Sequence, residues 1–531
     1  MSDMDLAEKE AATQQHSVAE HIDDTSSNGA PVDRPTTTKR MMFLGFYVGM
    51  AGWMYNFDLG YSGIVLQMMP FKEAFGTFGP VKKANGTVVH EYSLTPLQQS
   101  LVSVAIIFIG VGGALAGPIG KYGGRRGAIR AACFLIAVGA GGMLGTAGSY
   151  LNYMVCKCIQ GVGLGILLAA SPLWGAEVLL AEKRGLFLSL FGWGLALGQT
   201  MAGCVCLATS KYTTYLAWQT PIICHIPLAL IFGLCTFAFP ESPRWLLTKG
   251  REAEARRSFA TYYGKAVDDP IISYQVQQTS SHIEAELAAM KTASGLELLR
   301  GVNLRRTFAA LIVVLGIALT GIRFITTYAV IFLAGVGVGS PYLVTVIMAS
   351  CVCVGVIGTP ALMEYLGRRF GLLAGYSTLG IFMLLIAAVG TGLGPQSRVA
   401  QLVLVVFLCL WNFVYGLCLS ASLATISAEQ HSVRLRTNGQ AFTIVVYEVF
   451  AFGLSFAVPY MISANYGNMG LNIGYFFAGI SLIIWLGCFF FVPETGRLTL
   501  EQIDDMYASG KPAWKTSLKE NKRIAAMSAG I

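Results

Sequence analysis

Long apolar segments alternate with short polar ones along most of this chain. A helix needs about 20 apolar residues to cross about 30 Å of hydrocarbon, and segments such as AFTIVVYEVFAFGLSFAVPYMI (441–462) reach that length. Because no water reaches the backbone in lipid, each such span must be helical. We count about 12 of them. The predicted spans are 43–69, 97–119, 128–148, 151–176, 185–207, 217–239, 306–336, 341–363, 370–392, 399–427, 437–463 and 472–492.

The polar segments divide these spans into two groups of six. We predict an all-α membrane protein with helical bundles at 43–239 and 306–493. A Ser- and Thr-rich acidic segment, 1–42, is expected to be a disordered cytoplasmic tail. A charged linker with short helices, 240–305, joins the bundles. Residues 494–531 form a second cytoplasmic tail, and we interpret its short basic part, from about 506 to 531, as a membrane-surface anchor.

Composition and charge agree with a multi-pass membrane protein. Charged residues make up 12% of the chain, about half the roughly 25% typical of soluble domains. The net charge of +8 does not indicate nucleic-acid binding, since about 30 of the 37 Lys and Arg residues fall in segments on one side of the predicted spans. By the positive-inside rule that side is cytoplasmic, and so are both termini. The sequon Asn85-Gly86-Thr87 then faces outside, where Asn85 is expected to be glycosylated unless the sequon arose by chance.

The residues that support metal, cofactor or enzyme chemistry do not form the required patterns. The 12 cysteines lie in predicted spans without metal-ligand spacing, and we interpret them as small packing residues. No nucleophile–base pair or metal constellation occurs in the loops. We therefore expect no metal, no cofactor and no enzymatic activity.

Three short motifs occur twice, about 250 residues apart. YGGRRG (122–127) returns as LGRRFG (366–371), and PESPRWLL (240–247) returns as PETGRLTL (493–500). A glutamate and an arginine seven residues apart also occur in each half. A duplicated six-helix unit is typical of transporters whose binding site lies between the halves at the middle of the membrane.

These motifs, in this order, resemble the sugar porter family of the major facilitator superfamily over about residues 43–505. The resemblance also rests on FDLGYSGIV, GPIGKYGGRRG, EYLGRR and VPETGRLTLEQIDDMY, and the last is most similar to fungal hexose and α-glucoside permeases. It implies the major facilitator fold with 12 transmembrane helices in two six-helix bundles. It also implies a plasma-membrane transporter that works by alternating access, with the monomer as its working unit.

The family also implies a cytoplasmic gate built from arginine–glutamate clusters, which pair when the site faces outward. Such charge-assisted pairs break and re-form at modest net cost. In the first half the matching residues are Arg125, Arg126, Glu177, Arg184, Glu241 and Arg244; in the second they are Glu364, Arg368, Arg369, Glu429, Arg436, Glu494 and Arg497. One departure is Lys121, which stands where the family has an acidic residue, so the first-half gate is expected to pair differently.

Asp58 and Lys157 are charged residues inside predicted spans. A charge at the centre of a bilayer costs about 2.5–3.5 kcal/mol on insertion scales, which marks such residues for function. In proton-coupled family members an Asp at this position accepts the proton and a basic residue on helix 4 tunes it. We therefore predict proton symport with Asp58 as carrier and Lys157 as modulator. The alternative is a static ion pair that holds helices 1 and 4 together.

The predicted substrate site departs from the family pattern. Glutamine and asparagine positions that bind sugar hydroxyls in relatives are here Ile317, Ala318, Arg323, Gly192 and Val352. Since each hydroxyl buried without a partner costs about 1–3 kcal/mol, an ordinary hexose is not expected. Either Arg323 holds a substrate carboxylate in a bidentate fork, or Arg323 and Glu448 neutralise each other. The candidate substrate-binding residues are Thr320, Arg323, Thr327, Tyr328, Asn412, Tyr447 and Glu448.

Three functions remain open at this stage. The first is a proton-driven importer of a sugar or sugar-like polar molecule. The second is an exporter of a specialised metabolite with an altered pocket on the same scaffold. The third is a nutrient sensor that binds substrate without moving it, which the short C-terminal tail disfavours. The substrate, the direction of transport and the oligomeric state cannot be read from the sequence.

Overall fold

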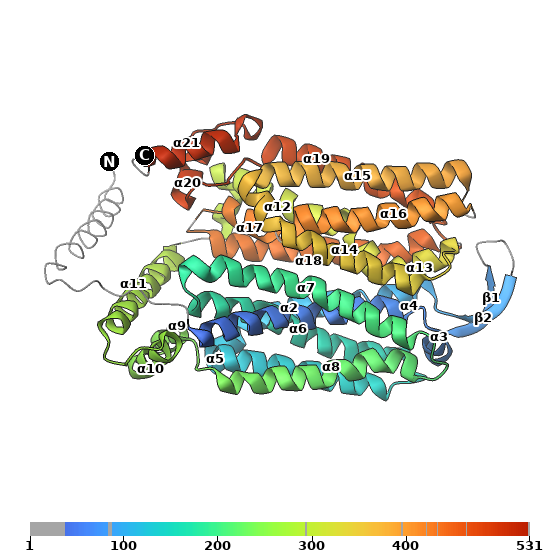
Figure 1. Ribbon diagram of the computed structural model, residues 1–531, viewed down its shortest axis with the longest axis horizontal. Helices are drawn as coiled ribbons and strands as arrows, with labels where there is room; N and C mark the ends of the chain where they lie inside the picture. Colours follow the sequence, from blue (N-terminus) through green and yellow to red (C-terminus); the bar gives the residue numbers. More distant parts are fainter. Residues whose placement is uncertain are drawn as a thin grey trace.

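Two helical bundles lie side by side with their helices along the long axis of the molecule (Figure 1). The computed structural model describes residues 38–82, 88–292, 295–394, 397–420, 422–432, 434–463 and 465–528. The first bundle contains α2 (Lys39–Val65), α3 (Met69–Phe75), α4 (Pro96–Leu101), α5 (Val104–Leu144), α6 (Tyr150–Val178), α7 (Ala181–Thr209), α8 (Leu216–Cys235) and the 3-10 turn η2 (Thr236–Ala238). Each bundle has an apolar core of its own, and a further apolar cluster joins residues of the first bundle to Val330 of the second.

The second bundle repeats this arrangement with more interruptions. It contains α12 (Gly301–Leu319), α13 (Ile322–Val336), α14 (Pro341–Tyr365), α15 (Arg368–Leu393), α16 (Arg398–Val414), the π-helical turn η4 (Tyr415–Ser420), α17 (Ser422–Gln430), α18 (Arg436–Ile462), the 3-10 turn η5 (Gly470–Asn472) and α19 (Ile473–Phe491). The predicted span 306–336 is two helices, because the chain breaks at Thr320 and Gly321, where Gly321 has a φ of 99°.

Every predicted apolar segment lies on these helices. Within the described residues, 10 helices are long and apolar enough to cross a membrane. Two predicted spans are counted together in Pro96–Leu144, and α2 is not among the ten because residues such as Asn56 and Asp58 lower its hydropathy. The prediction of a multi-pass helical membrane protein is confirmed.

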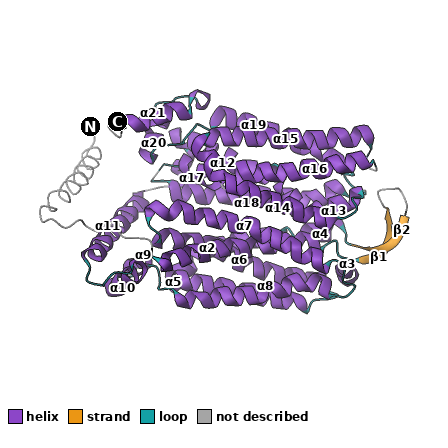
Figure 2. Ribbon diagram, in the orientation of Figure 1, coloured by secondary structure: helices purple, strands orange, loops and turns teal. Residues whose placement is uncertain are grey.

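The two ends of the molecule differ in what covers them. A hairpin of β1 (Thr77–Lys82) and β2 (Val88–Ser93) extends from one end, which we call the hairpin end (Figure 2). The opposite end, the linker end, carries the linker and the C-terminal tail. The linker forms α9 (Pro243–Thr248), α10 (Glu252–Tyr263), α11 (Pro270–Thr292) and η3 (Gly295–Leu299), and the tail forms α20 (Leu500–Ala508), η6 (Ala513–Lys515) and α21 (Leu518–Ser528). The sequence analysis did not predict the hairpin, which is short and mostly exposed.

The C-terminal tail packs on the second bundle. Arg306 of α12 pairs with Asp504 at 2.5 Å, and Arg305 of the same helix donates to the Lys511 carbonyl at 2.8 Å. Within the tail, the Asn521 amide donates to the Glu494 carbonyl at 2.9 Å. These contacts hold the tail against the linker end of the second bundle, and its interaction with the membrane surface stays a prediction.

The two bundles contact each other toward the hairpin end. Ser100 donates to the Phe456 carbonyl at 2.7 Å, and Ser103 bonds to Ser455 at 2.8 Å. Gly63 of α2 lies against Thr327 of α13 so closely that a Cβ there would overlap the Thr327 carbonyl. In contrast, each ion pair that the structure gives between described residues lies within one half and its adjoining linker or tail. The described contacts therefore close the hairpin end more tightly than the linker end.

Replacing Gly63 with valine is expected to open the hairpin end, because the added side chain cannot fit against the Thr327 backbone. Spin labels at the exposed positions Leu97 and Tyr466, in a background without the native cysteines, would report a longer inter-bundle distance. The matched control is Gly110→Val, where a side chain meets nothing within 4 Å. An unchanged distance in the Gly63 variant would contradict the tight inter-bundle contact.

Candidate functional site

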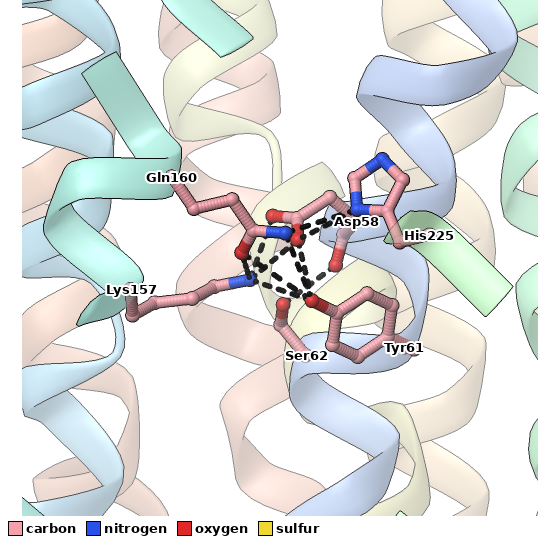
Figure 3. Close-up of polar contacts among 6 residues, drawn as sticks. All are labelled: Asp58, Tyr61, Ser62, Lys157, Gln160 and His225. Carbon is pink, nitrogen blue, oxygen red and sulfur yellow. Dashed lines mark hydrogen bonds and ion pairs between the residues drawn. The ribbon is translucent and has the colours of Figure 1, made fainter. Parts of the chain in front are cut away.

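A buried ion pair joins α2 to α6 near the middle of the first bundle (Figure 3). The Lys157 ammonium nitrogen lies 2.6 Å from Oδ1 and 2.7 Å from Oδ2 of Asp58. The two residues are 1% and 2% exposed. Removing one partner of such a pair leaves an uncompensated buried charge, at a cost of about 3–5 kcal/mol. Each charge therefore requires the other in this buried site.

Three neighbouring side chains complete a hydrogen-bonded network around this pair (Figure 3). Tyr61 donates to Asp58 Oδ1 at 2.7 Å, and Gln160 Oε1 accepts from Lys157 at 3.1 Å. Gln160 also bonds to His225 Nδ1 at 2.9 Å, and that nitrogen lies 3.8 Å from Asp58. The sequence analysis missed Tyr61 and Gln160, although each stands three residues after its partner, on the same helical face.

Asp58 and Lys157 line a small cavity between the two bundles. The cavity has a volume of about 20 Å³, which is room for about one water molecule. Ser103 and Ile106 of the first bundle and Arg323, Thr327 and Ser455 of the second are also in its lining. The charges on α2 and α6 thus share one space with the charge on α13. A sugar-sized molecule does not fit here unless the bundles move apart.

Arg323 occupies the first turn of α13, directly after the break in the helix. It is 8% exposed, and its Nη2 donates to the Tyr447 hydroxyl at 3.1 Å. Its Nε has no hydrogen-bond partner among the described residues, and neither has Oε2 of Glu448. Among the described residues the structure gives no direct ion pair between Arg323 and Glu448, but the two charges interact electrostatically, so their mutual neutralisation stays an alternative.

The remaining candidate substrate residues have different surroundings. Thr327 lines the cavity. Tyr328 is fully buried, and its hydroxyl lies 3.1 Å from Ser103 and donates to the Gln99 carbonyl at 3.4 Å, which places it in the contact that closes the hairpin end. Thr320 and Asn412 donate to carbonyls of their own helices. Of the predicted set, Arg323 and Thr327 are the ones on the cavity surface.

At the linker end of the first bundle, two glutamates organise the chain between the predicted second and third spans. Arg125 forms a two-point contact with Glu177, with Nε to Oε2 at 2.9 Å and Nη2 to Oε1 at 2.5 Å. Glu241 accepts from the backbone amides of Arg125 and Arg126 at 2.9 Å and 3.2 Å. Ser242 donates to Glu177 at 2.6 Å. We call these five residues the first-half cluster.

The second bundle contains the same arrangement. Arg368 contacts Glu429 through Nε and Nη2 at 3.0 Å and 2.9 Å. Glu494 accepts from the amides of Arg368 and Arg369, both at 3.0 Å, and Thr495 donates to Glu429 at 2.7 Å. We call these residues the second-half cluster. The repeat seen in the sequence is therefore also a repeat of individual hydrogen bonds.

A glycine with positive φ precedes the arginine in each cluster. Gly124 has a φ of 75° and Gly367 a φ of 94°. A Cβ at either position would overlap the carboxylate of Glu241 or Glu494. The glycine thus turns two successive amides toward one carboxylate, a backbone anion site of the kind called a nest.

The clusters differ in one pair. Arg497 donates to Glu364 at 2.7 Å in the second half, and the residues at the matching positions of the first half are Arg244 of α9 and Lys121. Two cations cannot form that pair, so the departure noted in the sequence has a structural consequence: the first half lacks the counterpart of this bridge.

The surroundings of the predicted gate residue Arg436 include a buried histidine. Arg436, the first residue of α18, lies near His431 in the preceding loop, where burial, together with Arg306 and Arg436, lowers the pKa of His431 to about 4. His431 is therefore neutral at physiological pH. The side chain of Arg184 and the whole of Asn85 lie outside the described residues.

Comparisons with known proteins agree with this architecture. A profile described as "Sugar (and other) transporter" matches residues 44–507. The chain is 28% identical to the high-affinity fructose transporter ght6 of Schizosaccharomyces pombe, over 90% of this chain and 89% of that protein. It is 26% identical to hexose transporter HXT10 of Saccharomyces cerevisiae, over 90% and 87%.

The fold is also that of a solved transporter. A structure of the proton:xylose symporter XylE superposes with a TM-score of 0.68 at 18% identity, covering 89% of this chain and all of that one. The xylose transporter XylE from E. coli in a partially occluded inward-open conformation gives the same score. The predicted twelve-helix major facilitator fold is confirmed.

Alanine at Gly124 or Gly367 is expected to destabilise the protein by about 1–3 kcal/mol, the usual cost of holding a residue with a side chain in such a conformation. The added Cβ also displaces the glutamate that binds the two amides. The thermal unfolding temperature of the purified protein is the measurement. Gly123→Ala is the control, since a side chain there meets nothing within 4 Å. Equal unfolding temperatures for Gly123→Ala and Gly124→Ala would show that the nest does not depend on glycine.

Proposed function

This chain belongs to the sugar (and other) transporter family, and from that premise we propose that it imports a sugar or sugar-like polar molecule together with protons. It is a multi-pass membrane transporter, and no enzymatic function is assigned to it. Its relatives are named for the transport of fructose, glucose and other hexoses. We place it in the plasma membrane with the linker end in the cytoplasm, in keeping with the positive-inside distribution of its charges.

The observation that carries the proton-coupled part of this proposal is the Asp58–Lys157 pair beside the inter-bundle cavity. A carboxylate this deeply buried is stable either as half of an ion pair or as a neutral acid. Protonation of Asp58 releases Lys157 to its other partners, Gln160 and Tyr61. Because the cavity lies between the bundles, a change of their spacing alters the surroundings of Asp58. This links proton binding to the conformational cycle.

The two arginine–glutamate clusters support alternating access. In this conformation each cluster bonds within its own half, while the hairpin end is closed by contacts between halves. We propose that the linker end closes when the bundles rock the other way, bringing the clusters together as the cytoplasmic gate. The partly exposed pairs in each cluster suit this role, because their net energy is small.

Asp58→Asn is expected to abolish substrate-driven proton uptake, because the amide cannot accept a proton for release on the other side. Alkalinisation of the medium on substrate addition, in cells that express the protein at the surface, is the measurement. The control is Glu73→Gln, which removes an exposed carboxylate of α3. Proton uptake that persists in the Asp58 variant, in step with substrate, would exclude Asp58 as the carrier.

Lys157→Met is expected to separate substrate exchange from accumulation. Without the ammonium that stabilises the ionised form, Asp58 stays protonated, so the carrier still exchanges substrate across the membrane but accumulates it less against a gradient. Counterflow and concentrative uptake in proteoliposomes measure the two activities. Lys211→Met, at an exposed site, is the control. If both activities fall equally, Lys157 holds α2 and α6 together and has no specific part in coupling, which is the static ion-pair alternative.

A further inference from the structure

Arg323 is a buried cation with unused hydrogen-bonding capacity. Its guanidinium carries five N–H donors in a planar fork, yet its side-chain hydrogen-bond partners are the neutral hydroxyls of Tyr447 and Tyr55, and Nε is unbonded. Glu448 interacts with Arg323 electrostatically but forms no direct ion pair with it among the described residues. A buried charge that lacks a direct partner is disfavoured unless a ligand or water supplies one. The position at the cavity surface allows a ligand to do so.

The backbone at this point also favours an anion. α13 begins at Ile322, after the break at Gly321, and Arg323 is its second residue. The first turn of a helix carries a partial positive charge from its unpaired amides. In transporters, half-helix N-termini of this kind point at anionic groups of the substrate. Helix terminus and side chain therefore act in the same direction.

The charges around the cavity do not balance. Its lining contains two cations, Lys157 and Arg323, against the single carboxylate of Asp58. Glu448 lies outside the lining but interacts electrostatically with Arg323. Within the lining itself, one further negative charge would balance the two cations.

We propose that the transported molecule is a polyhydroxylated carboxylate, a sugar acid, whose carboxylate binds Arg323 at the start of α13. This inference rests on the proposed transport function and specifies its substrate class. A fork-to-fork contact between guanidinium and carboxylate would use the unbonded Nε. The hydroxyls of the molecule would lie toward Thr327 and Ser455, which share the cavity surface.

A carboxylate substrate also explains why proton and substrate binding are coupled. An ionised Asp58 repels a second carboxylate in the same cavity, whereas a protonated Asp58 leaves two cations facing it. Substrate binding therefore favours protonation of Asp58, and protonation favours substrate binding to the same degree, as linkage requires. Among the described residues, the titratable groups near this carboxylate are Tyr61, Tyr153, Lys157, His225 and Arg323.

Matched substrate pairs test the proposal directly. In each pair the acid has a carboxylate where the neutral compound has a hydroxymethyl group. The pairs are galacturonate and galactose, glucuronate and glucose, and gluconate and glucitol. Uptake of each labelled compound by proteoliposomes with the full chain, under an inward proton gradient, is the measurement. We expect at least one acid to be taken up about tenfold faster than its neutral counterpart.

Substitutions of Arg323 then assign the preference to this residue. Arg323→Gln removes the charge and is expected to abolish the preference for the acid. Arg323→Lys keeps the charge without the planar fork and is expected to retain part of that preference. Arg398→Gln, an exposed arginine at the start of α16, is the control. The acid should also raise the unfolding temperature of the wild-type protein but not that of Arg323→Gln, which reports binding without transport.

A second readout follows from charge balance. A monocarboxylate that enters with one proton carries no net charge, so its uptake should not respond to an imposed membrane potential. Neutral sugar entering with one proton carries a positive charge and should respond. Potential-sensitive uptake of the acid would contradict a one-to-one electroneutral cycle and with it the coupling described here.

The outcomes separate the two proposals. If the wild-type protein moves a neutral sugar with protons as well as or better than the matching acid, the sugar-acid inference is wrong and the transport function stands. If the preference for the acid survives in Arg323→Gln, the carboxylate is not held at α13. If the folded protein moves no member of the panel, the importer proposal fails, and this inference fails with it.

Discussion

The need to neutralise charges in a low-dielectric interior governs the middle of this molecule. Asp58 and Lys157 are stable there because each compensates the other at 2.6 Å and because Tyr61 and Gln160 satisfy their remaining hydrogen bonds. A proton on Asp58, a charged substrate in the cavity or a change in the spacing of the bundles would each disturb this balance. A buried pair of this kind adds little net stability compared with apolar packing. In the proposed mechanism its role is to give Asp58 two well-defined states, one ionised and paired with Lys157 and the other protonated.

The repeat in the sequence accounts for the part of the structure that is the same in both halves. The two clusters reproduce each other down to the glycine with positive φ, the carboxylate that binds two successive amides and the hydroxyl that supports the second glutamate. The first half departs at one position, where Lys121 stands in place of the acid Glu364 while Arg244 matches Arg497. The two clusters therefore share a framework and differ at the Arg497–Glu364 bridge of the second half.

Sequence reasoning reached the helices and the repeated clusters because apolar length and repeated motifs are local signals. The spacing of Tyr61 after Asp58 and of Gln160 after Lys157 was also readable, but it acquires meaning only when α2 and α6 are known to be adjacent. Other features depend on contacts between distant segments. Tyr328 lies against Ser103 at the hairpin end, and the tail is held on the second bundle through Asp504 and Lys511. Neither arrangement has a signature in its own stretch of sequence. Whether Arg323 forms a direct ion pair with Glu448 also depends on how α13 and α18 pack, which the sequence does not give.

The two halves share a plan but divide the chemistry of the cavity between them. In the proposed cycle, the first half supplies Asp58 and Lys157 for proton exchange, and the second supplies Arg323 at a broken helix to hold an anion. The charges of the first half come close to Arg323 only when the bundles approach each other, because α2 and α6 belong to one bundle and α13 to the other. If coupling resided in a single half, substrate and proton could bind without sensing the conformation of the transporter. Placing the charges on opposite sides of the moving interface makes their interaction depend on the bundle spacing, and that dependence is what a symporter needs.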